Sequence, residues 1–231
     1  MTYKIKNNFW IDTMPKYSLV LFLLCNILAM IFYPGGNMLD PLQKGYSFSS
    51  NFFSDLGMTK THQSPESSNL ISCILFNGSL SLVGVCFTML FYKIKNIFFK
   101  NKMLSIVATM LGVFSGLSFI GVALTPSNIL LEYHVIFANW AFRFLFGASF
   151  LYSILMYKTN DLDNKYAYAF TLFGLLVFIY VYYTQFYLEM PDVDNGVLNN
   201  HVLAQKTVVI WIFFSVYIYS LGIQKYFKKK F

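Results

Sequence analysis

The chain has 231 residues, of which 57% are hydrophobic and only 12% are charged. A soluble domain carries roughly twice that charged fraction, so the composition excludes an ordinary soluble domain. The net charge of +7 would suit a nucleic-acid-binding protein, but most of the basic residues lie in short segments before, between and after the apolar runs, and we expect no nucleic-acid partner.

Six apolar segments follow one another along the chain, and each comes close to the roughly 20 residues that a helix needs to cross a bilayer core. They cover about 17–33, 70–92, 103–124, 133–157, 166–188 and 201–224. The sequence therefore predicts an all-α integral membrane protein, in which 17–224 form one bundle of six transmembrane helices. A very apolar soluble core is the alternative, but unbroken runs of this length favour spanning helices.

Thirteen of the seventeen basic residues lie before the first segment, after the second, after the fourth or after the last. Because basic residues concentrate on the cytoplasmic side of membrane proteins, we expect both termini to be cytoplasmic. The chain would then begin with a basic cytoplasmic arm at 1–16 and end with a basic cytoplasmic tail at 225–231.

The connection between the first two segments, 33–69, is the only long polar stretch and would lie on the outer side. It contains Ser54 and Asp55, directly after Phe52 and Phe53. A serine and an aspartate could act as a nucleophile and an acid–base group in a lipid-modifying site, or could simply cap a short helix. The two phenylalanines predict that the loop folds against the bundle and brings Asp55 towards the outer ends of the fourth and sixth segments.

The second and third segments carry small residues at helical spacing, among them Gly84, Gly112 and Gly116. Small residues let membrane helices approach closely, so we interpret them as a packing face and not as a cofactor site. Only a few residues separate the third segment from the fourth, which predicts an antiparallel helical hairpin.

Two basic residues lie inside predicted spans, where a charge is costly. Arg143 lies nine residues beyond His134, about 13 Å along a helix, and Asn139 lies one turn above it. We expect Arg143 to point into the bundle towards an acid, and Asp55 is the best placed by sequence. Lys206, near the start of the last segment, could instead extend to the interface.

Histidines open the fourth and sixth segments. Glu132 precedes His134, and Gln205 follows His201 by one turn. Together with Asp55, the two histidines could form a zinc site or a general-base pair. The alternative is that each histidine is an interfacial polar residue with no ligand.

Two motifs resemble known membrane families. The run NFFSDLG followed by PESSN is similar to the ISD-x-G…PPES pattern in the first loop of the damage-regulated autophagy modulator family, which includes proteins that remodel the lipids of glycosylphosphatidylinositol anchors. TPSN…EYHVIFANWAF resembles both that family and, more closely, a prokaryotic six-span family of unknown function with a DxISxLG-like loop. The matching positions are Ser54, Asp55, Gly57, Pro65, Glu66 and His134; Leu56 replaces a threonine and Pro65 stands where the pattern has two prolines.

The resemblance implies an integral membrane protein with a lipid-related or regulatory role, and we expect it in the plasma membrane of a prokaryote. The predicted function is binding of a lipid headgroup in a polar cup on the outer face, because cations bind phosphate while acids and amides bind hydroxyls or amines. The expected ligand-binding residues are Asp55, Glu66, Glu132, His134, Asn139, Arg143, His201, Gln205 and Lys206.

Two other functions remain open. One is a membrane-embedded lipid hydrolase or acyl transferase, with Ser54, Asp55, His134 and His201 as catalytic candidates and Asp55, His134 and His201 as candidate zinc ligands. The other is a small transporter, although the sequence contains neither the proline-broken segment pair nor the inverted repeat typical of that class. Membrane lipid is the only partner that the sequence indicates.

Overall fold

The structure, a computed structural model, describes residues 9–159, 162–186 and 194–230. Within these residues it contains six long helices and no β-strand, and each helix is long and apolar enough to cross a membrane. The predicted all-α architecture, with six helices long and apolar enough to span a membrane, is confirmed. The helices are α1 (Met14–Phe32), α2 (Leu70–Ile94), α3 (Lys102–Leu124), α4 (Leu131–Tyr157), α5 (Asn164–Phe186) and α6 (Asn195–Lys230).

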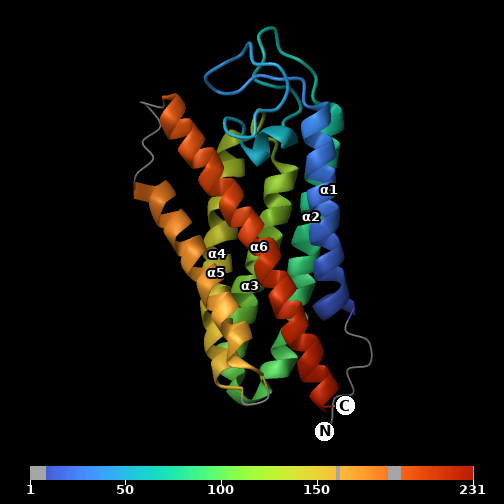
Figure 1. Ribbon diagram of the computed structural model, residues 1–231, viewed down its shortest axis with the longest axis vertical. Coiled ribbons are helices and arrows are strands. Elements are labelled where there is room, and N and C mark those ends of the chain that lie inside the picture. Colours follow the sequence, from blue (N-terminus) through green and yellow to red (C-terminus); the bar gives the residue numbers. More distant parts are fainter. Residues whose placement is uncertain (1–8, 160–161, 187–193, 231) are drawn as a thin grey trace.

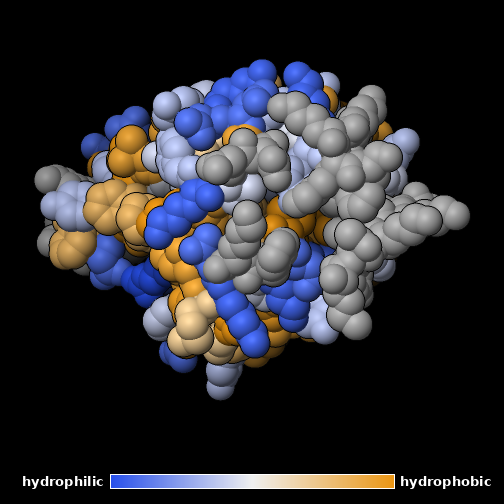
Figure 2. Space-filling view, turned by 90° about the horizontal axis from the view of Figure 1, so that it is seen from below, coloured by the Kyte–Doolittle hydropathy of each residue, from blue (hydrophilic) through white to orange (hydrophobic). Residues whose placement is uncertain are grey.

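Each helix packs against the next from α1 to α5, and α6 returns across the bundle to contact both α5 and α1. In Figure 1 the connection between α1 and α2 lies over one end of the bundle, which we call the loop end. The first helical residues and the end of α6 lie at the opposite end. Seen from that opposite end, hydrophilic residues spread over the face with hydrophobic residues between and beside them (Figure 2).

The helix boundaries agree with the sequence to within a few residues, except at the start of α1 and at both ends of α6, which begins at Asn195 and so places His201 inside the helix and not at its opening. α1 begins at Met14 after a π-helical turn at Phe9–Thr13, so half of the predicted arm is helical. Pro15 is tolerated there because the first turn of a helix has no partner for its N–H. α6 continues to Lys230, so the predicted tail extends the last helix; residues 1–8, 187, 188 and 231 lie outside the described residues.

The predicted packing face between the second and third spans is also present. A Cβ atom on Gly84 would lie 2.7 Å from the carbonyl oxygen of Gly116, and a Cβ atom on Gly116 would lie 2.7 Å from the carbonyl oxygen of Gly84. The two backbones therefore touch, which only glycine permits, and α2 and α3 form a tightly packed pair.

Candidate functional site

The loop-end connection is fastened to the first turns of α2. Its central part is a short 3₁₀ helix, Phe53–Gly57, whose Leu56 side chain is fully buried. The side chains of Asn69 and Ser72 donate hydrogen bonds to the Leu56 carbonyl, each at 3.1 Å, and Asn77 donates to the Gly57 carbonyl at 2.9 Å. The connection thus folds against the bundle, and its position is fixed by buried polar groups of α2.

Asn51 organises the remainder of the connection and is 0% exposed. Its Nδ2 donates to the Gly36 carbonyl at 2.8 Å and to Oδ2 of Asp55 at 2.9 Å. Its Oδ1 accepts from Nε2 of Gln43 at 2.7 Å and from the backbone N–H of Ser47 at 3.0 Å. All the hydrogen-bonding groups of this amide are therefore used, and Asn51 connects several parts of the loop. No sequence pattern predicts this role.

Asp55 is 4% exposed, and its carboxylate is held within the loop. Besides the bond from Asn51, its Oδ2 accepts from the backbone N–H of Phe52 at 3.1 Å. Its Oδ1 lies 3.8 Å from Nε2 of His62. The histidine beside Asp55 is therefore His62, and not His134 or His201 as the sequence predicts. Ser54 is half-buried, and its hydroxyl makes no hydrogen bond to any residue in the described part of the chain.

Lys206 turns into the protein and does not extend to the interface. The residue is 1% exposed, and its ammonium donates to the backbone carbonyls of Phe48 and Asn51, both at 2.5 Å. The rings of Tyr46, Phe48 and Phe53 surround it at 4.7 to 5.5 Å from their centroids. Carbonyl oxygens and aromatic faces together stabilise a buried cation, so this ammonium fastens the loop to α6 and is not available to a ligand.

The residues around Lys206 strengthen the same attachment. Oε1 of Gln205 accepts from the backbone N–H of Phe53 at 3.0 Å. One turn earlier on α6, the His201 ring packs edge-on against Phe52, with centroids 5.0 Å apart. Gln205 and His201 therefore both hold the loop against α6.

Two tyrosines make further hydrogen bonds within the loop: Tyr33, which is buried, and Tyr46, which is half-buried. Tyr33 donates its hydroxyl to the Gly36 carbonyl at 3.1 Å, and Tyr46 donates to the Asn51 carbonyl at 3.0 Å. Burial raises the pKa of both phenols above the ordinary value, and the negative charge of Asp55 raises each pKa further. Both tyrosines remain neutral hydrogen-bond donors over the physiological pH range.

His134 stabilises the turn between α3 and α4. Its Nδ1 lies 2.7 Å from the Thr125 carbonyl oxygen, and because that oxygen is only an acceptor, Nδ1 carries the proton. In residues 9–159, 162–186 and 194–230, no three His, Cys, Asp or Glu side chains are placed to hold a metal ion. The candidate zinc ligands Asp55, His134 and His201 are thus held by separate structural contacts.

Arg143 is half-buried and lies apart from the loop. Its guanidinium donates to Oε1 of Gln185, on α5, at 2.5 Å and lies 5.5 Å from the ring of Trp140. The predicted pairing with Asp55 is wrong, because α4 is rotated so that Arg143 faces the end of α5. Among the described residues no carboxylate lies within ion-pair distance of Arg143, so its hydrogen-bonded partner is a neutral amide.

The other candidates are exposed. Glu132 and Asn139 lie on the exposed surface of α4, on the loop-end side of Arg143. Glu66 pairs with Lys60 at 2.8 Å on the surface of the loop, with 64% of its side chain exposed. The nine expected ligand-binding residues therefore fall into a buried loop network, an exposed loop ion pair and a group on α4.

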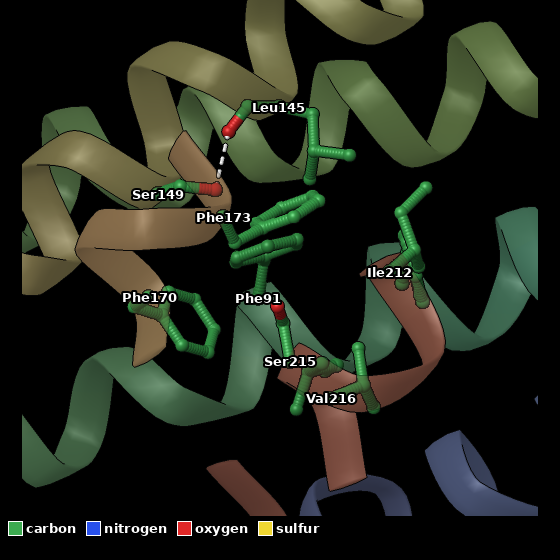
Figure 3. Close-up of a pocket in the computed structure, with 10 residues that line it drawn as sticks. Phe91, Leu145, Ser149, Phe170, Phe173, Ile212, Ser215 and Val216 are labelled. Carbon is green, nitrogen blue, oxygen red and sulfur yellow. Dashed lines mark hydrogen bonds between the residues drawn. The ribbon is translucent and has the colours of Figure 1, made fainter. Parts of the chain in front are cut away.

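A small cavity lies deeper in the bundle, between α2, α4, α5 and α6 (Figure 3). Its volume of about 20 Å³ gives room for one water molecule. Aromatic and aliphatic side chains form most of its lining, and the Ser149 hydroxyl, which also lines it, donates to the Leu145 carbonyl. This cavity is too small for a lipid headgroup.

Comparison with known proteins gives no family for the chain: no family model matches it, and neither a curated protein nor a solved structure matches it. The resemblance of the loop and turn motifs therefore stays a prediction. Of the two cations expected in the cup, Lys206 is enclosed by the protein, whereas Arg143 is half-exposed and hydrogen-bonded to a neutral amide.

Proposed function

We propose that the protein binds the headgroup of a membrane lipid at Arg143, in the half of the bundle nearer the loop end. The observation that carries this proposal is a half-exposed guanidinium in the middle of a spanning helix, with a neutral amide as its hydrogen-bonded partner. We further propose that the protein resides in the plasma membrane of a prokaryote, with both termini cytoplasmic and the loop end outside, since the basic residues gather at the other end.

The charge on Arg143 is energetically costly in its position on α4. A charged side chain at the centre of a spanning helix costs about 2.5–3.5 kcal/mol on insertion scales, and a neutral acceptor offsets only part of that. A phosphate group accepts two parallel hydrogen bonds from a guanidinium and supplies the opposite charge. A lipid phosphate therefore completes this site, and the exposed amides of Gln185 and Asn139 supply further donors beside it.

The proposed site is smaller than the cup that the sequence predicts. Lys206 and Asp55 are each hydrogen-bonded to Asn51. They therefore hold the loop in place and do not contact the lipid. The resemblance of the loop motif to a lipid-remodelling family agrees with a lipid ligand but does not locate it.

The test is native mass spectrometry of the protein purified in mild detergent, read for retained lipid and retained metal. The wild-type protein is expected to retain a phospholipid, and Arg143→Met to lower its occupancy by roughly tenfold or more, since a guanidinium–phosphate pair is lost. Lys60→Met, which removes an exposed lysine of the loop, is the matched control and should leave retention unchanged. Equal lipid retention by Arg143→Met and the wild type would overturn the proposal.

Glu189 provides a second control, because it lies four positions after Gln185 in the sequence but outside the described residues. If a lipid phosphate is the counter-charge of Arg143, Glu189→Gln should retain lipid as the wild type does. If Glu189 is instead the counter-charge, Glu189→Gln and Arg143→Met should lower the melting temperature alike and leave lipid retention unaltered, which contradicts the proposal.

A second candidate function rests on the contact between Asp55 and His62. A carboxylate beside an imidazole can orient a general base, as a lipid hydrolase or acyl transferase requires. In that case Asp55→Asn abolishes turnover of a phospholipid substrate without loss of folded protein. We favour binding over turnover because the Ser54 hydroxyl has no imidazole partner among the described residues.

A further inference from the structure

We propose that the loop-end half of α4 forms the wall of a hydrated lateral groove, through which the phosphodiester headgroup of a lipid in the loop-end leaflet reaches Arg143 and which is closed to the opposite leaflet. This inference rests on the proposed function and adds the route and the leaflet from which the lipid comes.

Three polar residues of α4 form a stripe on one face of the helix. At 100° per residue, Glu132, Asn139 and Arg143 fall within roughly 40° of one another around the helix axis. Glu132 and Asn139 are exposed and Arg143 is half-buried. The stripe thus begins at the first turn of α4 and descends about 16 Å along the helix to the guanidinium.

The described residues of α5 do not extend over this stripe. α4 and α5 are antiparallel neighbours, and Gln185, the last residue but one of α5, lies level with Arg143. The twelve residues of α4 before Arg143, about 18 Å of helix, therefore extend past Phe186, the last described residue of α5. Figure 1 shows the upper end of α5 well below the upper end of α6.

The same face of α4 becomes apolar beyond Arg143. Gly147, Phe150 and Ile154 continue the face towards the opposite end of the bundle, and Phe150 is 54% exposed. The polar residues of this face therefore lie between the loop end and Arg143, with the exposed Ile136 among them, and the polar face stops at Arg143. Water and a headgroup can follow it from one leaflet only, because an apolar face in hydrocarbon offers no hydrogen bonds.

The charge at the bottom of the stripe defines the ligand. One guanidinium balances the single negative charge of a phosphodiester and can donate two parallel hydrogen bonds to it. Asn139 lies one turn above and offers an amide to the remaining headgroup oxygens. The acyl chains of such a lipid would lie along the exposed apolar side chains of α4, such as Ile136.

The inference is tested by measuring whether water reaches Asn139. Single cysteines are introduced in full-length protein carrying Cys25→Ala, because Cys73 and Cys86 are buried and only Cys25 is partly accessible. A membrane-impermeant, cationic methanethiosulfonate is added to intact cells, and the modified fraction is followed over time by mass spectrometry. Only a hydrated thiolate reacts with this reagent.

Two matched positions act as controls. Leu117 of α3 is 48% exposed and lies about as far below the loop end as Asn139, but on an apolar face. Phe150 lies on the same face of α4 as the stripe, beyond Arg143. We expect Asn139→Cys to react roughly tenfold faster, or more, than either Leu117→Cys or Phe150→Cys, since only a hydrated thiol ionises readily.

The outcomes separate the two proposals. If Asn139→Cys reacts as slowly as Leu117→Cys, the groove is overturned, even if lipid retention depends on Arg143. If Phe150→Cys reacts as fast as Asn139→Cys, the polar route does not end at Arg143 and the one-sided access is overturned. Fast reaction of Asn139→Cys alone supports the groove, and the Arg143→Met lipid measurement then decides the headgroup site independently.

Discussion

The ammonium of Lys206 donates a hydrogen bond to the backbone carbonyl of Asn51, 155 positions earlier in the chain. The side chain of Asn51 in turn donates to the carboxylate of Asp55. One residue therefore links the buried cation of α6 to the buried anion of the loop. This relationship makes the loop part of the folded bundle and not a free connection.

Replacing Lys206 by methionine should destabilise the protein. The substitution removes two hydrogen bonds from a charged group, and we expect a loss of about 2–4 kcal/mol in the free energy of unfolding. The measurement is thermal unfolding in detergent together with limited proteolysis of the 34–69 connection, which should become faster. Lys60→Met, with an exposed ammonium paired to Glu66, should leave both unchanged; equal behaviour of the two variants would refute the attachment.

The two hydrogen-bonded tyrosines of the loop predict alkaline destabilisation. The pKa of Tyr33 and of Tyr46 is raised in the folded protein, so the folded state keeps protons that the unfolded state loses above its ordinary pKa near 10. Their stability contribution is therefore complete below about pH 10 and is lost at higher pH, by up to about 1.4 kcal/mol per pH unit for each tyrosine. Melting temperatures between pH 9 and 11 should fall less steeply for a Tyr33→Phe, Tyr46→Phe variant than for the wild type. Identical slopes would show that these phenols do not set the pH dependence.

Two glycines of α2 and α3 should respond oppositely to alanine. A Cβ atom on Gly116 would lie 2.7 Å from the Gly84 carbonyl, so Gly116→Ala should cost about 1–3 kcal/mol through overpacking. Gly78, also in a spanning helix, has open space around it, and Gly78→Ala should be neutral or should stabilise by up to about 1 kcal/mol. Thermal unfolding of the two variants compares the effects directly, and a destabilised Gly78→Ala would contradict the packing argument.

Replacing Gln185 tests whether Arg143 is stabilised mainly by a lipid phosphate or mainly by its protein partner. If phosphate supplies most of the stabilisation, Gln185→Leu should lower lipid occupancy less than Arg143→Met does, because it removes one hydrogen bond of the guanidinium and leaves the guanidinium–phosphate pair in place. Arg143→Met should have the larger effect. The same native mass spectra provide the comparison, and an equal loss in both variants would mean that the amide is as important as the charge.

The sequence by itself determined the class of the protein, the number of spanning helices and most of their boundaries. Those properties depend on the length of apolar runs and on signals such as Pro15 in a first helical turn. Both are local, because they involve only residues that are close together in the sequence. The sequence also indicated that Gly84 and Gly116 belong to a packing face, since small residues recur at helical spacing.

Only the tertiary structure decided which polar groups meet. Arg143 was expected beside Asp55 and instead binds Gln185, while Lys206 reached the loop that Arg143 was expected to reach. The direction in which a side chain points depends on the rotation of its helix, and apolar runs that face lipid on one side and neighbours on the other do not specify that rotation. Packing between distant segments sets it, and packing therefore placed Lys206 under the loop and left Arg143 facing the end of α5.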